Sequence, residues 1–279
     1  MRRHRRWHRL LGDRTRLRGR CRKGVKDVGD SIQHERLAGD LPDPLRESFS
    51  REILPGEIDG FRTLCHVVVP GDTVALTPAA TTGRALLFTA GCGRAEVGSN
   101  SWEIGEIALL VPSHLQPVSV TATDAPLRFL ELLLDLSPTD REELVDNADK
   151  LPFFISYAQC PTYRERIKSE KTVSRTLLPE HTYPRLCIGS VETTGDDRVA
   201  AHEHPMLEQL FYGLQGNDCL MQADEVQLGF GEDVLVHIPL GSRHGVEVSA
   251  PNRLHYIWID VFRDRSGMDW IVREHIPEP

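Results

Sequence analysis

The 279-residue sequence lacks the features that mark several classes of protein. No apolar run approaches the roughly 18 to 20 residues that a membrane helix needs, so we expect no membrane span. The six cysteines show neither Cys-x-x-Cys spacing nor the density of a disulfide scaffold, which favours reduced thiols. Paired arginines near the start resemble an export signal, but no apolar segment follows them. We therefore expect a cytoplasmic protein that has no membrane partner.

The formal charge of −8 combines two very different parts of the chain. Residues 1–26 contain ten arginines, two lysines and one aspartate, a net charge of +11, so the rest of the chain carries −19. Binding to phosphates relies on clustered lysine and arginine, and the acidic body therefore argues against nucleic acid as the main partner. A basic block of this kind is usually disordered. A contact with RNA or an acidic membrane and a non-native tail from an upstream start site both stay open for it.

Two parts of the chain have the texture of an all-β protein. In residues 51–136 and 185–279, short apolar stretches are separated by Gly, Pro, Asn and Asp, which predicts many short strands in a sandwich or barrel. The segment PVSVTAT alternates apolar and hydroxyl side chains, as half-buried strands do. GEIALLVPSHLQPVSV in the first part and GEDVLVHIPLGSRHGVEV in the second share a Gly-Glu start, an apolar strand, a proline and an alternating strand. We interpret this as a weak internal repeat, which predicts two barrels of one plan.

The ranges 1–50 and 137–184 lack this texture. Ser137 suits a helix N-cap, Pro138 suits the first helical position, and acidic residues follow in the first turn. A second polar stretch, PTYRERIKSEKTVSR, also has helical propensity. We expect residues 1–50 to form a basic, disordered head and lead-in, and residues 137–184 to form a mainly helical connector.

Two separate motifs carry the chemistry. His202 and His204 are two positions apart, and such side chains on a strand point to the same side. Glu208 follows after three residues, and His244 opens an alternating strand after the turn sequence PLG. Three imidazoles and one carboxylate suit a divalent transition metal such as Fe, Mn, Ni, Zn or Cu and leave positions open for substrate or O2. Calcium and magnesium are poor candidates because both favour oxygen ligands.

These motifs resemble those of the cupin superfamily, in which a small jelly-roll barrel carries G(x)5HxH(x)3-4E(x)6G and then G(x)5PxG(x)2H(x)3N. The resemblance covers residues 195–248. Each motif is slightly irregular: six residues separate Gly195 from His202, and Val248 stands where Asn is usual.

One irregularity bears on the fourth ligand. The residue separated from Gly216 by six others is Gln209, which also has the four-residue spacing from His204. Glu208 and Gln209 therefore compete for this position. A carboxylate neutralises charge and binds such a cation more strongly than an amide does, which favours Glu208.

The resemblance implies an all-β fold of two cupin-type jelly-roll barrels joined by the connector. Residues 51–136 would be a degenerate, metal-free barrel, because no histidine lies where its HxH motif would be. This barrel would support the other one or form the interface of a homodimer. Residues 185–279 would be the metal-binding barrel of such a bicupin, with the metal site between about 185 and 262.

Strand alternation adds catalytic candidates around the metal. Arg198 would share the face of the two paired histidines, and Tyr212 the face of Glu208. A guanidinium there grips a carboxylate, a phenol donates a proton, and His237 is a candidate general base. The alternatives are a surface ion pair for Arg198, core packing for Tyr212, and orientation of a metal ligand or an edge hydrogen bond for His237. On the last strand the inward set stays open, either His255, Ile257 and Ile259 or Tyr256, Trp258 and Asp260.

The leading functional hypothesis is a metal-dependent enzyme that acts on a small organic, sugar or aromatic acid. The metal would polarise a substrate oxygen or bind O2, which suits an isomerase or a dioxygenase. The fold does not select between such reactions. The alternative is a non-catalytic bicupin that binds a small metabolite as a sensor or scaffold.

Overall fold

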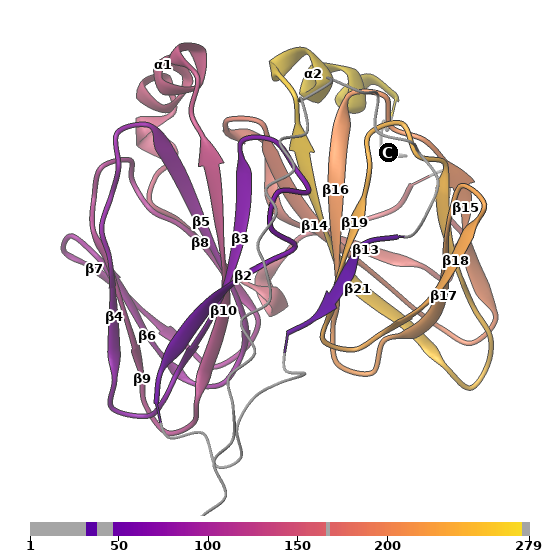
Figure 1. The fold of residues 1–279 in the computed structure, drawn as a ribbon, viewed down its shortest axis with the longest axis horizontal. Helices are drawn as coiled ribbons and strands as arrows, with labels where there is room; N and C mark the ends of the chain where they lie inside the picture. Colours follow the sequence, from indigo (N-terminus) through magenta and orange to yellow (C-terminus); the bar gives the residue numbers. More distant parts are fainter. Residues whose placement is uncertain (1–31, 38–46, 166–167, 275–279) are drawn as a thin grey trace, which may run out of the picture. The chain divides into compact units, whose positions relative to one another are not determined.

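The computed structural model describes residues 32–37, 47–165 and 168–274, and most of them lie in antiparallel strands (Figure 1). The basic head predicted for residues 1–26 lies outside this described part. Two α-helices and two short 3-10 helices complete the described secondary structure. None of the described helices is long and apolar enough to cross a membrane.

The first half of the described chain forms a six-stranded and a four-stranded sheet. The six-stranded sheet has the order β11-β8-β5-β10-β3-β2, with bounds Phe153–Ser156, Ala108–Val111, Thr82–Ala90, Leu127–Asp135, Phe61–Val68 and Phe49–Ile53. The four-stranded sheet has the order β4-β9-β6-β7, with bounds Thr73–Leu76, Val118–Ala122, Gly93–Val97 and Asn100–Ile104. Side chains such as Phe88 and Phe129 from the larger sheet pack against Val97 and Val120 from the smaller one in one core.

The second half forms a seven-stranded and a four-stranded sheet. The larger sheet has the order β1-β19-β16-β21-β14-β13-β12, with bounds His34–Arg36, Val234–Ile238, Leu207–Gly213, Arg253–Phe262, Leu186–Thr194, Val173–Tyr183 and Thr162–Tyr163. The smaller sheet has the order β15-β20-β17-β18, with bounds Asp197–His202, His244–Val248, Asp218–Ala223 and Val226–Gly231. Phe211 and Tyr256 of the larger sheet share a core with Met221 and Val246 of the smaller one.

A third core contains the other faces of the two larger sheets. Leu87 and Leu130 from the six-stranded sheet belong to the same buried cluster as Ile188 and Ile257 from the seven-stranded sheet. Each larger sheet is therefore apolar on both faces, which explains why its strands read as nearly continuous apolar runs rather than as alternating ones.

The predicted lead-in, residues 1–50, is partly wrong. Residues His34–Arg36 form strand β1, which pairs with β19 at the edge of the seven-stranded sheet and is drawn in indigo beside it (Figure 1). Leu37 follows and is fully buried, and its backbone nitrogen donates to the carbonyl of Asp233. A strand of three residues is too short to show an alternating pattern in the sequence. Its partner strand is about 200 positions away in the chain, so no local signal predicts the pairing.

In its described residues, the predicted helical connector, residues 137–184, is α-helical only at its start. Helix α1, Pro138–Asp146, begins at the cap predicted for it, because Ser137 and Asp140 exchange the two hydrogen bonds of a capping box. The rest contains the 3-10 helices Ala148–Lys150 and Tyr157–Gln159 and the strands β11, β12 and β13. Strand β13 pairs with β14 along its length, so sheet pairing overrides the helical propensity of this segment.

Helix α2, Arg265–Glu274, follows the last strand. Met268 and Ile271 pack with Leu207 and Phe262 of the seven-stranded sheet in a small apolar cluster. This packing holds the helix against the same sheet that carries β16 and β21, and Ile271 also reaches the cavity described below.

Candidate metal centre

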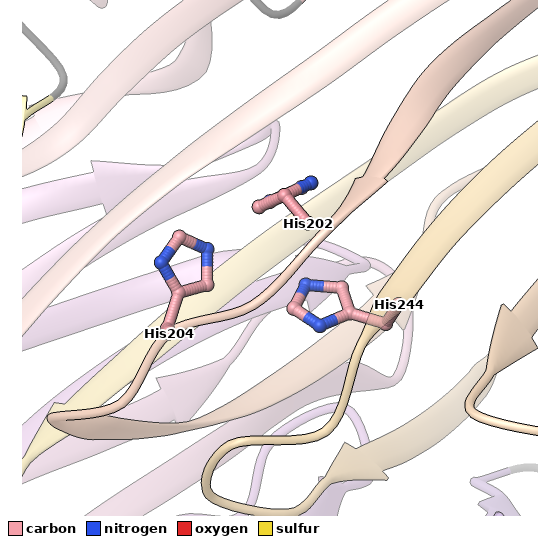
Figure 2. A group of neighbouring side chains, drawn as sticks. All are labelled: His202, His204 and His244. Carbon is pink, nitrogen blue, oxygen red and sulfur yellow. The ribbon is translucent and has the colours of Figure 1, made fainter.

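Three histidines from β15, the loop after it and β20 come together in the second sheet pair (Figure 2). Each of His202, His204 and His244 offers a ring nitrogen, and these three nitrogens all lie within 4.8 Å of one another. His204 and His244 are buried and His202 is half-buried. The structure thus brings together the three histidines that the two sequence motifs singled out.

The pairing of β15 with β20 positions two of these side chains. His202 lies directly opposite His244 across the two antiparallel strands, and the register shifts between Val199 and His202. Gly245 gives this irregular stretch of β15 room, because a Cβ at that position would lie 2.8 Å from the carbonyl oxygen of Val199. A bulge changes which face the following residues present, so His202 reaches the cavity together with Val199.

The turn of the second motif connects the same two segments. Gly241 has a φ of 74°, a conformation that favours glycine, and its backbone nitrogen donates to the carbonyl oxygen of His204 at 3.2 Å. The Ser242 hydroxyl donates to a carboxylate oxygen of Asp224 at 2.7 Å. These two hydrogen bonds hold the proline-glycine turn in place, and the one from Gly241 keeps His204 beside the start of β20.

Hydrogen bonds orient two of the imidazoles. Nδ1 of His202 lies 2.8 Å from the carbonyl oxygen of Ala200, and Nδ1 of His244 lies 3.0 Å from that of Ser242. A carbonyl only accepts, so Nδ1 carries the proton in both rings and Nε2 keeps its lone pair. Nε2 of His244 is buried without a hydrogen-bond partner.

Burial also keeps these imidazoles neutral. It lowers the pKa of His202, and together with the proximity of His202 it brings the pKa of His244 down to about 4. A neutral imidazole with an available lone pair is the form that binds a metal. His202 and His244 therefore have the protonation state and the ring orientation that a cation requires.

The predicted ligand Glu208 does not join the three histidines. In β16, Gln209 lines the same cavity as the histidines, whereas Glu208 points to the opposite face of the sheet. There its Oε2 lies 2.7 Å from Nε2 of His237. Consecutive residues of a strand face opposite sides, so only one of the two competing residues can face the cluster. The inward residue is Gln209, which is also the one with six residues before Gly216.

The three histidines line a cavity of about 260 Å³. Its apolar wall comes from β14, β15, β16, β20, β21 and α2, and its polar groups come from β13, β16, β21 and the segment before β13. The lining residues are Tyr163, Glu165, Lys168, Thr176, Glu180, Cys187, Val191, Val199, His202, His204, Gln209, Phe211, His244, Gly245, Val246, Tyr256, Trp258, Asp260 and Ile271. A space of this size admits a small molecule beside the histidines.

The three predicted catalytic residues lie elsewhere. Arg198 lies opposite Glu247 in the register of β15 with β20, and its side chain is exposed. The register shift after Val199 separates its face from that of His202. Tyr212 and His237 are on the opposite face of the seven-stranded sheet. The Tyr212 hydroxyl donates to Asp233 at 2.9 Å, and His237 lies between the carboxylates of Glu208 and Glu57.

Sequence reasoning left the inward set of β21 open, and the structure selects Tyr256, Trp258 and Asp260. Trp258 lies against Gly189, where a Cβ would come within 2.1 Å of the indole. Asp260 is buried, and burial raises the pKa of its carboxyl to about 7. The opposite set contains His255, which hydrogen-bonds the Tyr157 hydroxyl at 3.0 Å outside the cavity.

The cavity residues before β13 were missed. Lys168 and Glu165 form an ion pair of 2.5 Å, and both side chains are almost fully buried. They belong to the stretch PTYRERIKSEKTVSR that the sequence suggests as a helix. In the sequence, such charged side chains are typical of a solvent-exposed surface, and no local signal indicates that these two are buried.

The interior of the first sheet pair holds a different polar group. Glu131 accepts hydrogen bonds from His66 at 2.7 Å and from Arg84 at 2.5 Å, and the His66 ring stacks on Phe129. This network satisfies the buried carboxylate and uses the one histidine that faces this core. Among the described residues, the group of histidines and acids whose ligand atoms converge is the trio in the second sheet pair.

Comparison with known proteins identifies the architecture. No family model and no curated protein matches the chain. A mutant of Bacillus subtilis oxalate decarboxylase matches 85% of this chain and 78% of its own length, with a TM-score of 0.62 and 14% identity. The cupin 2 conserved barrel domain protein of Leptotrichia buccalis matches 85% of this chain and 99% of its own length, with a TM-score of 0.58 and 14% identity. The chain has the cupin fold.

A third cupin-fold structure, the formate complex of Lactobacillus farciminis oxalate decarboxylase, is equally similar. It covers 85% of this chain and 87% of its own length, with a TM-score of 0.62 and 13% identity. The cupin resemblance drawn from the two histidine motifs is therefore confirmed at the level of the fold. The chemistry of the site rests on the residues of this chain.

Proposed function

We propose that this cupin-fold protein is a metal-dependent enzyme acting on a small organic acid, with one divalent transition metal held by His202, His204 and His244. The observation that carries the proposal is the convergence of three imidazole nitrogens within 4.8 Å. We propose further that each sheet pair is one barrel of a bicupin and that only the second one binds the metal.

The residues present fit such an ion. Both Nδ1 atoms that hydrogen-bond backbone carbonyls leave Nε2 as the ligand atom, and Nε2 of His244 is buried without another partner. Oε1 of Gln209 is likewise buried without a hydrogen-bond partner, and Gln209 lines the same cavity. We therefore assign Gln209 as the fourth protein ligand in place of Glu208.

When bound, a metal such as Fe, Mn, Ni or Zn supplies Lewis acidity toward a substrate oxygen, and a redox-active one also supplies reactivity toward O2. The protein contributes a small cavity whose apolar wall excludes water from most of the substrate. Lys168 is the only lysine or arginine among the described residues that line it. A substrate carboxylate would bind its ammonium in competition with Glu165, and Asp260 is placed to accept or return a proton.

The neighbours of the same fold support the substrate class. Two of the three compared structures are named oxalate decarboxylases, and one of these is a complex with formate. Both names refer to small carboxylic acids, the substrate class that we propose for this chain. A dioxygenase or an isomerase remains our proposal for the reaction, and a bicupin that only binds such an acid is the competing one.

Elemental analysis tests the metal site. The purified protein should contain about one transition-metal ion per chain, and the His202→Ala, His244→Ala double variant should contain none. A Glu208→Gln variant is the matched control, because this side chain faces the other side of β16 and should leave the metal content unchanged. Equal metal content in the parent and the double variant would contradict the proposal.

Oxygen uptake then separates the reactions. The protein is loaded with Fe2+ without air and mixed with a panel of small organic, sugar and aromatic acids in an oxygen electrode. Uptake with one acid supports a dioxygenase, and conversion of an acid without uptake into a product of unchanged mass identifies an isomerase. Saturable binding of an acid without any conversion would favour the sensor or scaffold instead.

A further inference from the structure

A buried hydrogen bond connects Gln209 with an acid that no sequence motif marks. Nε2 of Gln209 donates to Oδ1 of Asp260 at 2.7 Å, and both residues are at least 94% buried. The two residues lie directly opposite each other across strands β16 and β21. This geometry is therefore set by the central strands of the seven-stranded sheet and not by a loop.

The contact determines which end of the amide faces the cavity. An amide has one donating and one accepting end, and the donating end of Gln209 is the one that meets Asp260. With the NH2 group held by Asp260, the carbonyl oxygen must point away from that acid. Oε1 is indeed buried without a hydrogen-bond partner, and Gln209 is one of the residues that line the cavity of the three histidines.

We propose that Asp260 is a positioning residue for the metal, which orients Gln209 so that Oε1 faces the histidine cluster. This inference rests on the proposed function, because it concerns the fourth ligand of the same ion. A hydrogen bond to a carboxylate also polarises the amide and makes its carbonyl oxygen a stronger donor. Gln209 and Asp260 together would thus supply the oxygen ligand that a single inward glutamate supplies in the cupin motif.

The neighbouring residues explain why this position holds an amide. A glutamate at 209 would place a second carboxylate 2.7 Å from Asp260, where two like charges in a buried site repel each other. The glutamate that the chain does have, Glu208, faces the other side and is bound to His237. Beside Gln209 the site therefore has the carboxylate of Asp260, one hydrogen bond behind the ligand.

Co2+ is the probe for the test, because its visible spectrum reports the ligand set independently of activity. Its affinity is measured by calorimetry on the full chain and on three variants, Asp260→Leu, Asp260→Asn and Gln209→Leu. Leucine removes the acceptor, whereas asparagine keeps an oxygen that can accept from the amide. Far-ultraviolet circular dichroism and thermal unfolding without metal check that each variant is folded.

We expect Asp260→Leu to weaken Co2+ binding by about 10- to 100-fold, as loss of a residue that orients a ligand does. Its Co2+ spectrum should match that of Gln209→Leu, and the double variant should bind no more weakly than Gln209→Leu alone. Asp260→Asn should lose less than about tenfold. Glu208→Gln, the control on the opposite face, should bind and absorb like the parent.

Two results would overturn the inference. One is a folded Asp260→Leu protein with the affinity and spectrum of the parent, and the other is a folded Asp260→Asn protein that has lost binding as completely as Gln209→Leu. Asp260→Asn changes the volume least, so it keeps the test decisive if leucine prevents folding. Failure of the parent itself to bind Co2+ would instead refute the proposed metal site.

Discussion

Replacing Gly245 with alanine tests how the second motif builds the histidine cluster. A Cβ at this position would lie 2.8 Å from the carbonyl oxygen of Val199 and 3.1 Å from two backbone atoms of Ala201. All three contacts are to backbone, so no flexible side chain can move away. The strands β15 and β20 must separate next to His202 and His244.

Overpacking of this kind costs about 1–3 kcal/mol. We expect the free energy of unfolding of Gly245→Ala to fall by about that amount, which urea titration measures. Because the shift displaces His202 relative to His244, the affinity for Co2+ should fall by about tenfold for each 1.4 kcal/mol needed to restore the cluster. Both effects should appear in the same variant.

Gly229→Ala is the matched control. This glycine lies in β18, at the other edge of the same four-stranded sheet, and a Cβ there would meet no atom within 4 Å. Its substitution should change the free energy of unfolding by less than about 0.5 kcal/mol and leave Co2+ binding unchanged. The reasoning is wrong if Gly245→Ala unfolds and binds like the parent, or if Gly229→Ala is equally damaging.

Three further predictions follow from the same structure. Burial opposes the ionisation of Glu131, but the hydrogen bond from His66 and the charge of Arg84 outweigh it and hold the pKa of the carboxyl below its ordinary 4.5. The stability that this carboxylate contributes is therefore present above pH 4.5 and is lost as the pH falls through the lower, folded-state pKa. Glu131→Gln should therefore flatten the acid side of the plot of unfolding free energy against pH, which urea titrations measure. An unchanged plot would contradict this. Leu37→Ala should lower the free energy of unfolding by about 2–5 kcal/mol, since the side chain is fully buried, whereas Leu220→Ala, at 41% exposure, should change it by less than about 0.5 kcal/mol. Removal of the metal by a chelator should lower the unfolding temperature, and restored ion at 100 times its Kd should return about 2.7 kcal/mol, a gain that the His202→Ala, His244→Ala variant should not show in calorimetry.

The sequence by itself determined the class of fold and the three histidines. Turn residues between short apolar stretches indicate sheets. The motif spacings around His202, His204 and His244 are local patterns, which can be recognised without knowing how the strands pair. The cap of α1 at Ser137 is equally local, because both of its hydrogen bonds join residues three positions apart. Each of these features depends on neighbours in the chain.

Only the tertiary structure decided which face each strand presents. A single register shift between Val199 and His202 moved Arg198 out of the cavity, and one position of alternation exchanged Glu208 for Gln209. The faces of β16 and β21 follow from pairing between residues about 50 positions apart. Both faces of the larger sheet are buried, so apolar alternation does not distinguish them. For that reason Asp260 and its contact with Gln209 emerged only when the strands were placed side by side.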